Sequence, residues 1–270
     1  MNELQSPGFP DALVAEALDA ALSIRNGHVP VFGISGLQGT GKSTLAAQVA
    51  ALARSRGLRA VVVSIDDFYL RKAERAALAR DVHPLLATRG PPGTHDVALA
   101  LRTLDALRAG EPATLPRFDK LGDDRLPESR WERIDGPADV VVFEGWFLAT
   151  PPQDETGLAE PINALERDED AGGTWRRWCN AALARDYPAL WSRIDALWFL
   201  QPPGFEVVPQ WRWEQEQALQ AGDPSRKAMD RAQVERFVQH YERTSRQALR
   251  TLPAIADRVV PLDARRRPFA

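Results

Sequence analysis

The chain has 270 residues, of which 44% are hydrophobic and 26% are charged, values that are typical of an ordinary globular protein. A formal net charge of −3 and an isoelectric point near 5.9 argue against a protein built mainly to hold nucleic acid, which would need a basic surface. Cys179 is the single cysteine, which excludes a disulfide within the chain, and no apolar run approaches the roughly 20 residues that cross a bilayer. The first residues lack the basic and apolar parts of a signal peptide, so we expect a cytoplasmic protein without membrane partners.

Two segments near the start of the chain have apolar residues at helical spacing. Leu13, Ala17 and Leu18 belong to the first, which predicts an amphipathic helix over residues 11–25. The second covers residues 42–56 and ends at Gly57, a residue type that commonly stops a helix. Between them, VPVFGIS at 29–35 predicts a short buried strand.

Four further apolar runs predict strands: AVVVSI at 60–65, ADVVVFEGWF at 138–147, IDALWFL at 194–200 and DRVVPL at 257–262. Continuous apolar character is typical of strands that are covered on both faces. Strands that alternate with helices of about 10–15 residues indicate βαβ units. We therefore expect an α/β fold with a mostly parallel sheet and helices on both faces.

Irregular stretches rich in proline, glycine and charge separate these elements, at residues 83–96, 115–131 and 151–173. We interpret them as loops over the strand ends, where functional residues usually lie. The sequence thus predicts one domain over residues 1–270, with acceptor-binding loops at about 83–130. The segment 153–173 is acidic, and a role in reshaping substrate access stays open at this point.

The run GLQGTGKS at 36–43 fits the pattern G-x-x-x-x-G-K-[ST] at every fixed position. Gly36 and Gly41 allow backbone angles that let successive N–H groups surround an anion, and the positive end of the following helix adds attraction. A chance glycine-rich turn is the alternative, but the strand before the run and the helix after it favour a phosphate loop. We therefore expect the phosphates of a nucleotide to be held by Gly36, Leu37, Gln38, Gly39, Thr40, Gly41, Lys42, Ser43 and Thr44.

Two side chains of this loop have specific expected roles. Lys42 would reach the β- and γ-phosphates, and the Ser43 hydroxyl would ligate Mg²⁺. The motif identifies a nucleotide and not a reaction, since switch proteins, motors, ABC-type ATPases and small-molecule kinases all carry it. The residues across the site must therefore decide the function.

Asp66 and Asp67 follow the strand at 60–65, at the end that lies on the phosphate-loop side of a parallel sheet. A kinase needs a carboxylate at this place to orient the attacking hydroxyl and accept its proton. Adjacent acids point in different directions, so one would face the acceptor while the other caps a helix or supports the metal site. The alternative is that both acids only cap a helix or face solvent.

Glu144 ends another buried strand, in VVVFEGWF. An acid at such a strand end is typical of the residue that holds Mg²⁺ in P-loop proteins, directly or through water. Alone it could be an ordinary strand end, but the preceding phosphate loop favours the functional interpretation.

Two of the predicted loops carry charged residues suited to a small anionic acceptor. Guanidinium groups hold carboxylates through two parallel hydrogen bonds, whereas the alternative for each residue is an ordinary surface ion pair. His95 could equally be a structural histidine. The candidates are Arg89, His95 and Asp96 in TRGPPGTHD, and Arg117, Asp119, Lys120 and Arg125 in LPRFDKLGDDR.

The segment QWRWEQEQALQ predicts a helix with Arg212 between Trp211 and Trp213. A helix that carries an arginine over the phosphates would be a lid, which we place at about 202–222. The alternative is that the tryptophans pack in the core while Arg212 faces solvent. Cys179 is expected to be a small buried residue and not a nucleophile.

Taken together, these motifs resemble the D-glycerate 3-kinase group within the uridine kinase, phosphoribulokinase and pantothenate kinase superfamily of P-loop kinases. The residues that carry the resemblance are GISGLQGTGKSTL, SIDDFYL, RGPPGTHD, LPRFDK, VVFEGWFL and WRWEQE, in that order along the chain. They span about residues 31–220, and FVQHYER and VVPLDARRRP extend the similarity toward residue 268. The resemblance implies a P-loop NTPase fold with an α-helical lid.

The resemblance also implies a reaction, in which the γ-phosphoryl group of ATP, with Mg²⁺ bound, passes to a hydroxyl of D-glycerate to give 3-phosphoglycerate. Asp66 falls at the position of the catalytic base, in an Asp-x-Phe-Tyr pattern that ends at Tyr69. Glu144 matches an acid after a conserved strand, and Lys42 and Arg212 would neutralise charge on the transferred group. Four residues lie in segments that surround the acceptor: Arg89, His95, Arg117 and Asp119.

Two other functions compete with this one. The first is a kinase of a nucleoside such as uridine, of pantothenate or of another hydroxy acid. The second is a nucleotide-dependent switch or ATPase that acts on a partner protein, although the sequence has no Asn-Lys-x-Asp guanine signature. For either kind of kinase the expected partner is a small hydroxylated molecule, and the charge of the chain argues against a nucleic-acid partner.

Overall fold

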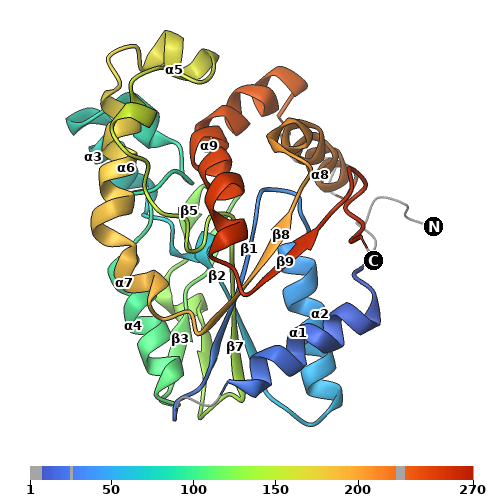
Figure 1. Ribbon diagram of the computed structural model, residues 1–270. Coiled ribbons are helices and arrows are strands. Elements are labelled where there is room, and N and C mark those ends of the chain that lie inside the picture. Colours follow the sequence, from blue (N-terminus) through green and yellow to red (C-terminus); the bar gives the residue numbers. More distant parts are fainter. Residues whose placement is uncertain (1–7, 25–26, 223–228, 270) are drawn as a thin grey trace.

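A parallel sheet with the strand order β2-β7-β1-β8-β9 forms the centre of the molecule (Figure 1). The computed structural model describes residues 8–24, 27–222 and 229–269. The sheet strands are β1 (Val31–Gly36), β2 (Ala60–Ser64), β7 (Val140–Gly145), β8 (Ala196–Gln201) and β9 (Arg258–Pro261). All five predicted strands are present and all four pairings are parallel, as the sequence predicts.

Helices and short hairpins connect the sheet strands. The helix predicted at 11–25 is α1 (Asp11–Ser23), and Arg25 lies outside the described residues. No described helix is long and apolar enough to span a lipid bilayer. The other elements are α2 (Lys42–Ser55), α3 (Lys72–Asp81), α4 (Val97–Arg108), β3 (Ala113–Leu115), β4 (Phe118–Asp119), β5 (Asp124–Arg125), β6 (Glu132–Ile134), α5 (Ala164–Glu169), α6 (Thr174–Asp186), α7 (Pro188–Trp191), α8 (Val208–Gly222) and α9 (Arg231–Thr251).

Successive residues of each central strand point into two different cores. In β7, Val140 and Val142 pack with the apolar faces of α1 and α2. Val141 and Phe143 pack on the other face, with residues of α4, α7 and α9. Figure 1 shows these two layers of helices on opposite sides of the sheet. Burial on both faces explains why the strands lack polar alternation, and the α/β prediction is confirmed.

The register of the sheet aligns the ends of three strands. Glu144 of β7 lies beside Ile34 of β1 on one side and Ser64 of β2 on the other. The phosphate loop follows β1, and Asp66 follows β2, so both begin at the same edge of the sheet as Glu144. Parallel strands meet at their carboxyl ends, and this edge is where α/β proteins bind ligands.

Two segments predicted as loops contain helices. The region 83–130 includes α4, whose first turn is capped by the Asp96 side chain, and the segment 151–173 includes α5, capped by Asn163. Both caps are residue types that favour a helix start, so the signal was present in the sequence. The proline and glycine content of the flanking residues instead favoured the prediction of loops.

Two arginines of α6 and α9 hold the acidic segment 153–173 against the body of the protein. Arg243 pairs with Glu166 at 2.6 Å and donates to the carbonyl oxygens of Gly157 and Glu160. Arg176 pairs with Asp170 at 3.0 Å, and the Arg and carboxylate side chains of both pairs are at least nine-tenths buried. The segment is therefore a packed part of the structure, and it does not line the cleft described below.

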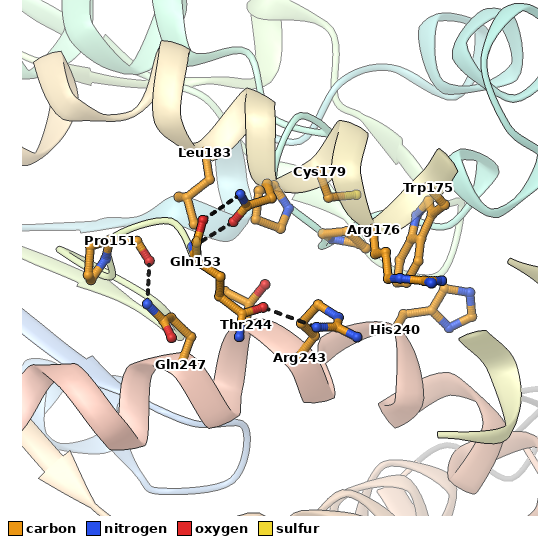
Figure 2. Close-up of a pocket in the computed structure, with 13 residues that line it drawn as sticks. Pro151, Gln153, Trp175, Arg176, Cys179, Leu183, His240, Arg243, Thr244 and Gln247 are labelled. Carbon is orange, nitrogen blue, oxygen red and sulfur yellow. Dashed lines mark hydrogen bonds between the residues drawn. The ribbon is translucent and has the colours of Figure 1, made fainter. Parts of the chain in front are cut away.

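A small cavity lies between these two helices. Figure 2 shows Trp175, Arg176, Cys179 and Leu183 of α6 facing His240, Arg243 and Gln247 of α9 across it. Its volume is about 20 Å³, which is close to that of one water molecule and far below that of a nucleotide. Cys179 is buried here, as the sequence predicts, and burial together with the negative charges of Asp170 and Glu166 raises the pKa of its thiol.

The substitution Arg243→Ala is expected to lower the free energy of unfolding by about 3–5 kcal/mol, because it leaves Glu166 charged and fully buried without its guanidinium. The matched control is Arg231→Ala, which breaks an exposed pair with Glu235 on the same helix and should cost about 0.3–0.5 kcal/mol. Urea denaturation measures both. Equal losses in the two variants would show that the segment does not depend on the buried pair.

Candidate active site

A cleft of about 750 Å³ opens at the edge of the sheet where β1, β2 and β7 end. This volume is within the range of small-molecule sites. The phosphate loop forms its floor, Asp66 and Glu144 line the strand ends, and α8 and α9 supply the opposite wall. The residues predicted for nucleotide, metal and acceptor binding that line it are Gln38, Gly39, Lys42, Ser43, Asp66, Tyr69, Arg89, Glu144 and Arg212.

The glycines of the phosphate loop are required for two different reasons. Gly41 has φ = 88° and precedes the first residue of α2, a conformation that side chains disfavour. Gly36 does not have a positive φ, in contrast to the sequence-based expectation for it. A Cβ there would lie 2.7 Å from the Thr40 hydroxyl oxygen, so Gly36 is needed for space. The loop begins the helix α2 and directs its N-terminus at the cleft.

Glu144 and Ser43 meet at the base of the cleft. The Ser43 hydroxyl donates a hydrogen bond of 3.0 Å to Glu144 Oε1. Burial raises the pKa of Glu144, an effect that the charge of Lys42 opposes and that of Asp66 adds to. A hydroxyl and a carboxylate are the oxygen ligands that Mg²⁺ prefers.

These two side chains fit a magnesium ion that is held partly by a nucleotide. Within the described ranges, no group of three or more histidine, cysteine or acidic side chains is placed to hold a metal by itself. Mg²⁺ commonly takes one or two protein ligands and completes its shell with phosphate oxygens and water. The donor set of Ser43 and Glu144 is of this kind.

Both oxygens of Asp66 accept hydrogen bonds. The Tyr69 hydroxyl donates to Oδ1 at 2.7 Å, and Lys120 Nζ donates to Oδ2 at 2.7 Å. Burial alone would raise the pKa of Asp66, but Lys120 and Lys42 outweigh burial and hold this pKa well below its usual range. Asp66 is therefore a fixed carboxylate anion that faces the phosphate loop across the cleft.

Asp67 has different partners from those expected of a metal-site residue. Its carboxylate accepts hydrogen bonds from the Phe118 backbone N–H and from Arg117, each at 3.0 Å. Asp67 is not among the residues that line the cleft. Its side chain fixes the start of the β4–β5 hairpin, from which Lys120 reaches the cleft.

The Arg89 guanidinium lines the cleft and is held from behind by Asp123, while its Nη2 donates to the carbonyl oxygen of Lys120 at 3.2 Å. The next residue, Gly90, packs against Tyr241, where a Cβ would lie 2.3 Å from the ring. Tyr241 donates to the Arg89 carbonyl oxygen at 2.8 Å. Gly90, the first glycine of the RGPPG run, thus lets α9 approach and position Arg89.

His95, Arg117 and Asp119 do not line the cleft. His95 stacks behind Tyr69, with ring centroids 4.8 Å apart, and its Nδ1 lies 2.7 Å from the Tyr187 hydroxyl. Burial lowers the pKa of His95 to about 3, so the ring is neutral. Arg117 bridges Asp67 and Glu132, and Asp119 accepts from the backbone of the hairpin tip. These residues position neighbours that face the cleft.

Helix α8 covers the region predicted as the lid. Trp211 is buried against Gly39 of the phosphate loop, so this part of the packing alternative is correct. Arg212 does not face solvent: its guanidinium lines the cleft, pairs with Glu216 at 2.8 Å and lies over the Phe237 ring. One helix therefore contacts the loop and presents a cation to the cleft.

Several lining residues were not among the predicted site residues. Lys120 is not one of these, since it was a candidate for binding an anionic acceptor, and it lines the cleft. Trp146 directly follows the Glu144-Gly145 signal, and its indole N–H has no hydrogen-bond partner within the described part of the chain. Tyr241 and Arg266 lie in FVQHYER and VVPLDARRRP, two segments that carry the resemblance but gave no role to either residue. Arg266 donates to the Gly39 carbonyl oxygen at 2.8 Å and joins the C-terminal segment to the loop.

No model of a known protein family matches the chain. A protein of Schizosaccharomyces pombe named uncharacterized kinase mug58 is 36% identical over 220 residues, which cover 78% of each chain. The chloroplastic D-glycerate 3-kinase of Arabidopsis thaliana is 32% identical over 250 residues. That match covers 86% of this chain, which spans only 52% of the plant enzyme's length.

A solved structure extends the similarity over nearly the whole fold. D-glycerate 3-kinase from Cryptococcus neoformans var. grubii superposes with a TM-score of 0.79 at 26% identity. The superposition covers 97% of this chain and 99% of that one. The arrangement of sheet and helices described above is therefore shared with a solved protein.

Replacing Glu144 with glutamine should have opposite effects on stability and on binding. Because burial raises the pKa of this acid in the folded state, its charged form opposes folding above the unfolded pKa, and the neutral amide should raise the urea midpoint at pH 7. Binding of ATP with Mg²⁺, measured by calorimetry, should weaken about 10- to 100-fold. Exposed Glu111 supplies the control variant Glu111→Gln, which should change neither quantity. A Glu144→Gln protein that binds normally would contradict the metal assignment.

The free energy of unfolding should fall as the pH is lowered from 6.5 to about 4. Burial lowers the pKa of His95 to about 3 and that of His240 to about 4, so the unfolded chain binds protons that the folded chain does not. Each histidine stabilises the fold above pH 6.5, and that stability is lost by about 1.4 kcal/mol per pH unit below it. Denaturation at a series of pH values should give this slope of the free energy of unfolding against pH. His240→Gln should reduce the slope by about 1.4 kcal/mol per pH unit, which is the contribution of one histidine. An unchanged slope in the variant would refute the assignment.

Proposed function

We propose that this chain, which belongs to the D-glycerate 3-kinase-like family of P-loop kinases, phosphorylates a hydroxyl of D-glycerate with ATP to give 3-phosphoglycerate. The coarser statement, a kinase with a P-loop nucleotide site, follows from that membership. The choice of D-glycerate is supported by the names of two relatives and by the cationic acceptor side of the cleft.

The observation that carries the proposal is the position of Asp66. It follows the strand next to the one that carries Glu144, lies in the same cleft as the phosphate loop and the cation Arg89, and pairs with Lys120. A switch protein or simple ATPase needs no carboxylate and cation pair on that side. A kinase of an acidic acceptor needs both, one for the hydroxyl and the other for the acid group.

In the proposed reaction the acceptor hydroxyl donates its proton to Asp66 while its oxygen forms a bond to the γ-phosphorus of ATP. The bond between that phosphorus and the bridging β–γ oxygen breaks, and ADP leaves. Lys42 and Arg212 neutralise charge on the transferred group from two sides of the cleft. Tyr69 keeps the Asp66 carboxylate oriented through its 2.7 Å hydrogen bond.

Ser43 and Glu144 are the residues that would hold Mg²⁺, which when bound withdraws charge from the phosphate oxygens. The backbone and side chains of residues 36–44 would hold the phosphates, with α8 as the lid over them. Arg89 and Tyr69 would contact the acceptor directly, whereas His95, Arg117, Asp119 and Asp67 support the residues that do. A single kinase domain over 1–270 and a cytoplasmic location stay predictions. The plant relative is named as chloroplastic.

A panel of acceptors separates this function from its rivals. ATP consumption should rise with D-glycerate and not with uridine or pantothenate, and the product should carry phosphate on carbon 3 by ³¹P NMR. Stimulation by pantothenate or uridine would replace D-glycerate with that acceptor. ATP hydrolysis that is independent of every acceptor would favour the switch or ATPase.

The substitution Asp66→Asn should remove most phosphoryl transfer, by about 10²–10⁴-fold, because the amide cannot accept the hydroxyl proton. ATP binding should persist, since the phosphate loop is unchanged; isotope transfer and calorimetry measure the two quantities. Asp168→Asn, at an exposed acid paired with Arg167, is the control and should keep full activity. Full turnover in the Asp66 variant would refute its role as the base.

A further inference from the structure

Lys120 blocks the carboxylate that the reaction needs. Its Nζ lies 2.7 Å from Asp66 Oδ2, while Tyr69 occupies the other oxygen. A carboxylate bonded to an ammonium group is a weak proton acceptor, because proton uptake would cost it the ion pair. The arrangement in the structure therefore holds Asp66 in a state that does not favour proton transfer.

The three arginines that line the cleft have carboxylate partners other than Asp66. Arg89 pairs with Asp123, Arg212 pairs with Glu216 and Arg266 pairs with Glu214. Lys120 differs from these three arginines because its acidic partner is the proposed base. Its release would therefore change the chemistry of the site directly.

Lys120 is also placed to move. It lies at the tip of the β4–β5 hairpin, and its side chain is 60% exposed whereas that of Asp66 is 27% exposed. The backbone of the tip is held, since the Lys120 carbonyl accepts from Arg89 and the Leu121 N–H donates to Asp119. A long flexible stem on a fixed backbone lets the ammonium change partner without a change of fold.

We propose that Lys120 exchanges partners during the reaction, leaving Asp66 for the carboxylate of the acceptor, so that an acidic acceptor both binds and releases the base. This inference rests on the proposed function and adds to it the group that selects acids. Without an acidic acceptor, Lys120 stays on Asp66 and suppresses transfer of the γ-phosphoryl group to water.

The short distance between Lys120 and Asp66 also limits the acceptor. A hydroxyl that Asp66 deprotonates must lie about 2.6–3.2 Å from it, and the acid group must at the same time reach Lys120. In glycerate one carbon separates the carboxyl carbon from the carbon that bears the terminal hydroxyl. Pantothenate has its carboxylate at the far end of a long chain from its terminal hydroxyl, and uridine has none. The exchange therefore selects short hydroxy acids.

The test uses Lys120→Met, which keeps the length of the side chain and removes its charge. Three quantities are measured in the full chain: the KM for D-glycerate, the transfer to glycerol as a neutral analogue, and ATP hydrolysis without acceptor. We expect the glycerate KM to rise at least tenfold, glycerol transfer to hold or increase, and hydrolysis to increase severalfold. The acidic limb of the rate profile should move to higher pH, because Asp66 loses its neighbouring charge. Lys120→Arg should restore the preference for glycerate over glycerol.

Lys72→Met is the matched control, since Lys72 is an exposed lysine at the start of α3 and does not line the cleft. It should behave as the unaltered protein in all three measurements. If Lys120→Met lowers glycerate and glycerol transfer equally and leaves hydrolysis unchanged, Lys120 is only structural and the exchange is wrong. Failure of the proposed function is a separate result: the unaltered protein would then not phosphorylate D-glycerate, while the hydrolysis measurement would still show whether Lys120 suppresses transfer to water.

Discussion

The parallel register of β2, β7 and β1 is the constraint on which the site depends. It places Glu144 level with Ser64 and Ile34, so the phosphate loop and Asp66 leave the sheet at the same height as the buried acid. A shift of one residue in β7 would turn Glu144 toward the opposite core and bring an apolar side chain to the cleft, since neighbouring strand residues face opposite sides. The apolar residues on both faces of β7 therefore also fix the chemistry at its end.

The shared edge of the sheet brings the carboxylates of Asp66 and Glu144 close together, and the surrounding cations offset their repulsion. Asp66 raises the pKa of Glu144 by repulsion, and Glu144 is buried while Asp66 is partly exposed. Lys42 lies near both acids, and Lys120 reaches Asp66 from the hairpin. The result is asymmetric: Asp66 is held as an anion while the charge of Glu144 is disfavoured. The two carboxylates thus differ in how strongly their charged forms are favoured, as their separate proposed roles require.

The parts of this architecture that depend on nearby residues could be predicted from the sequence. Hydrophobic runs located every sheet strand, and the glycine-lysine pattern located the phosphate loop. That Asp66 and Asp67 point in different directions could be predicted, but the partners of Asp67 could not, because they come from the hairpin some fifty residues later. Tyr241 and Arg266 were missed for the same reason, since tertiary packing alone brings α9 and the C-terminal segment to the cleft.

The contacts that Arg243 and Arg176 make with residues 153–173 determine which positions of this segment can change in evolution. Arg243 and Arg176 bind the segment largely through the carbonyl oxygens of Gly157, Leu158 and Ala159 together with neighbouring backbone. Every amino acid supplies a carbonyl oxygen, so these hydrogen bonds do not depend on which side chains the segment carries, whereas the ion pairs require Glu166 and Asp170. The exposed positions of this segment are therefore free to diverge, while the two buried arginines and their acids are not. New surface properties can accumulate there without disturbing the cleft.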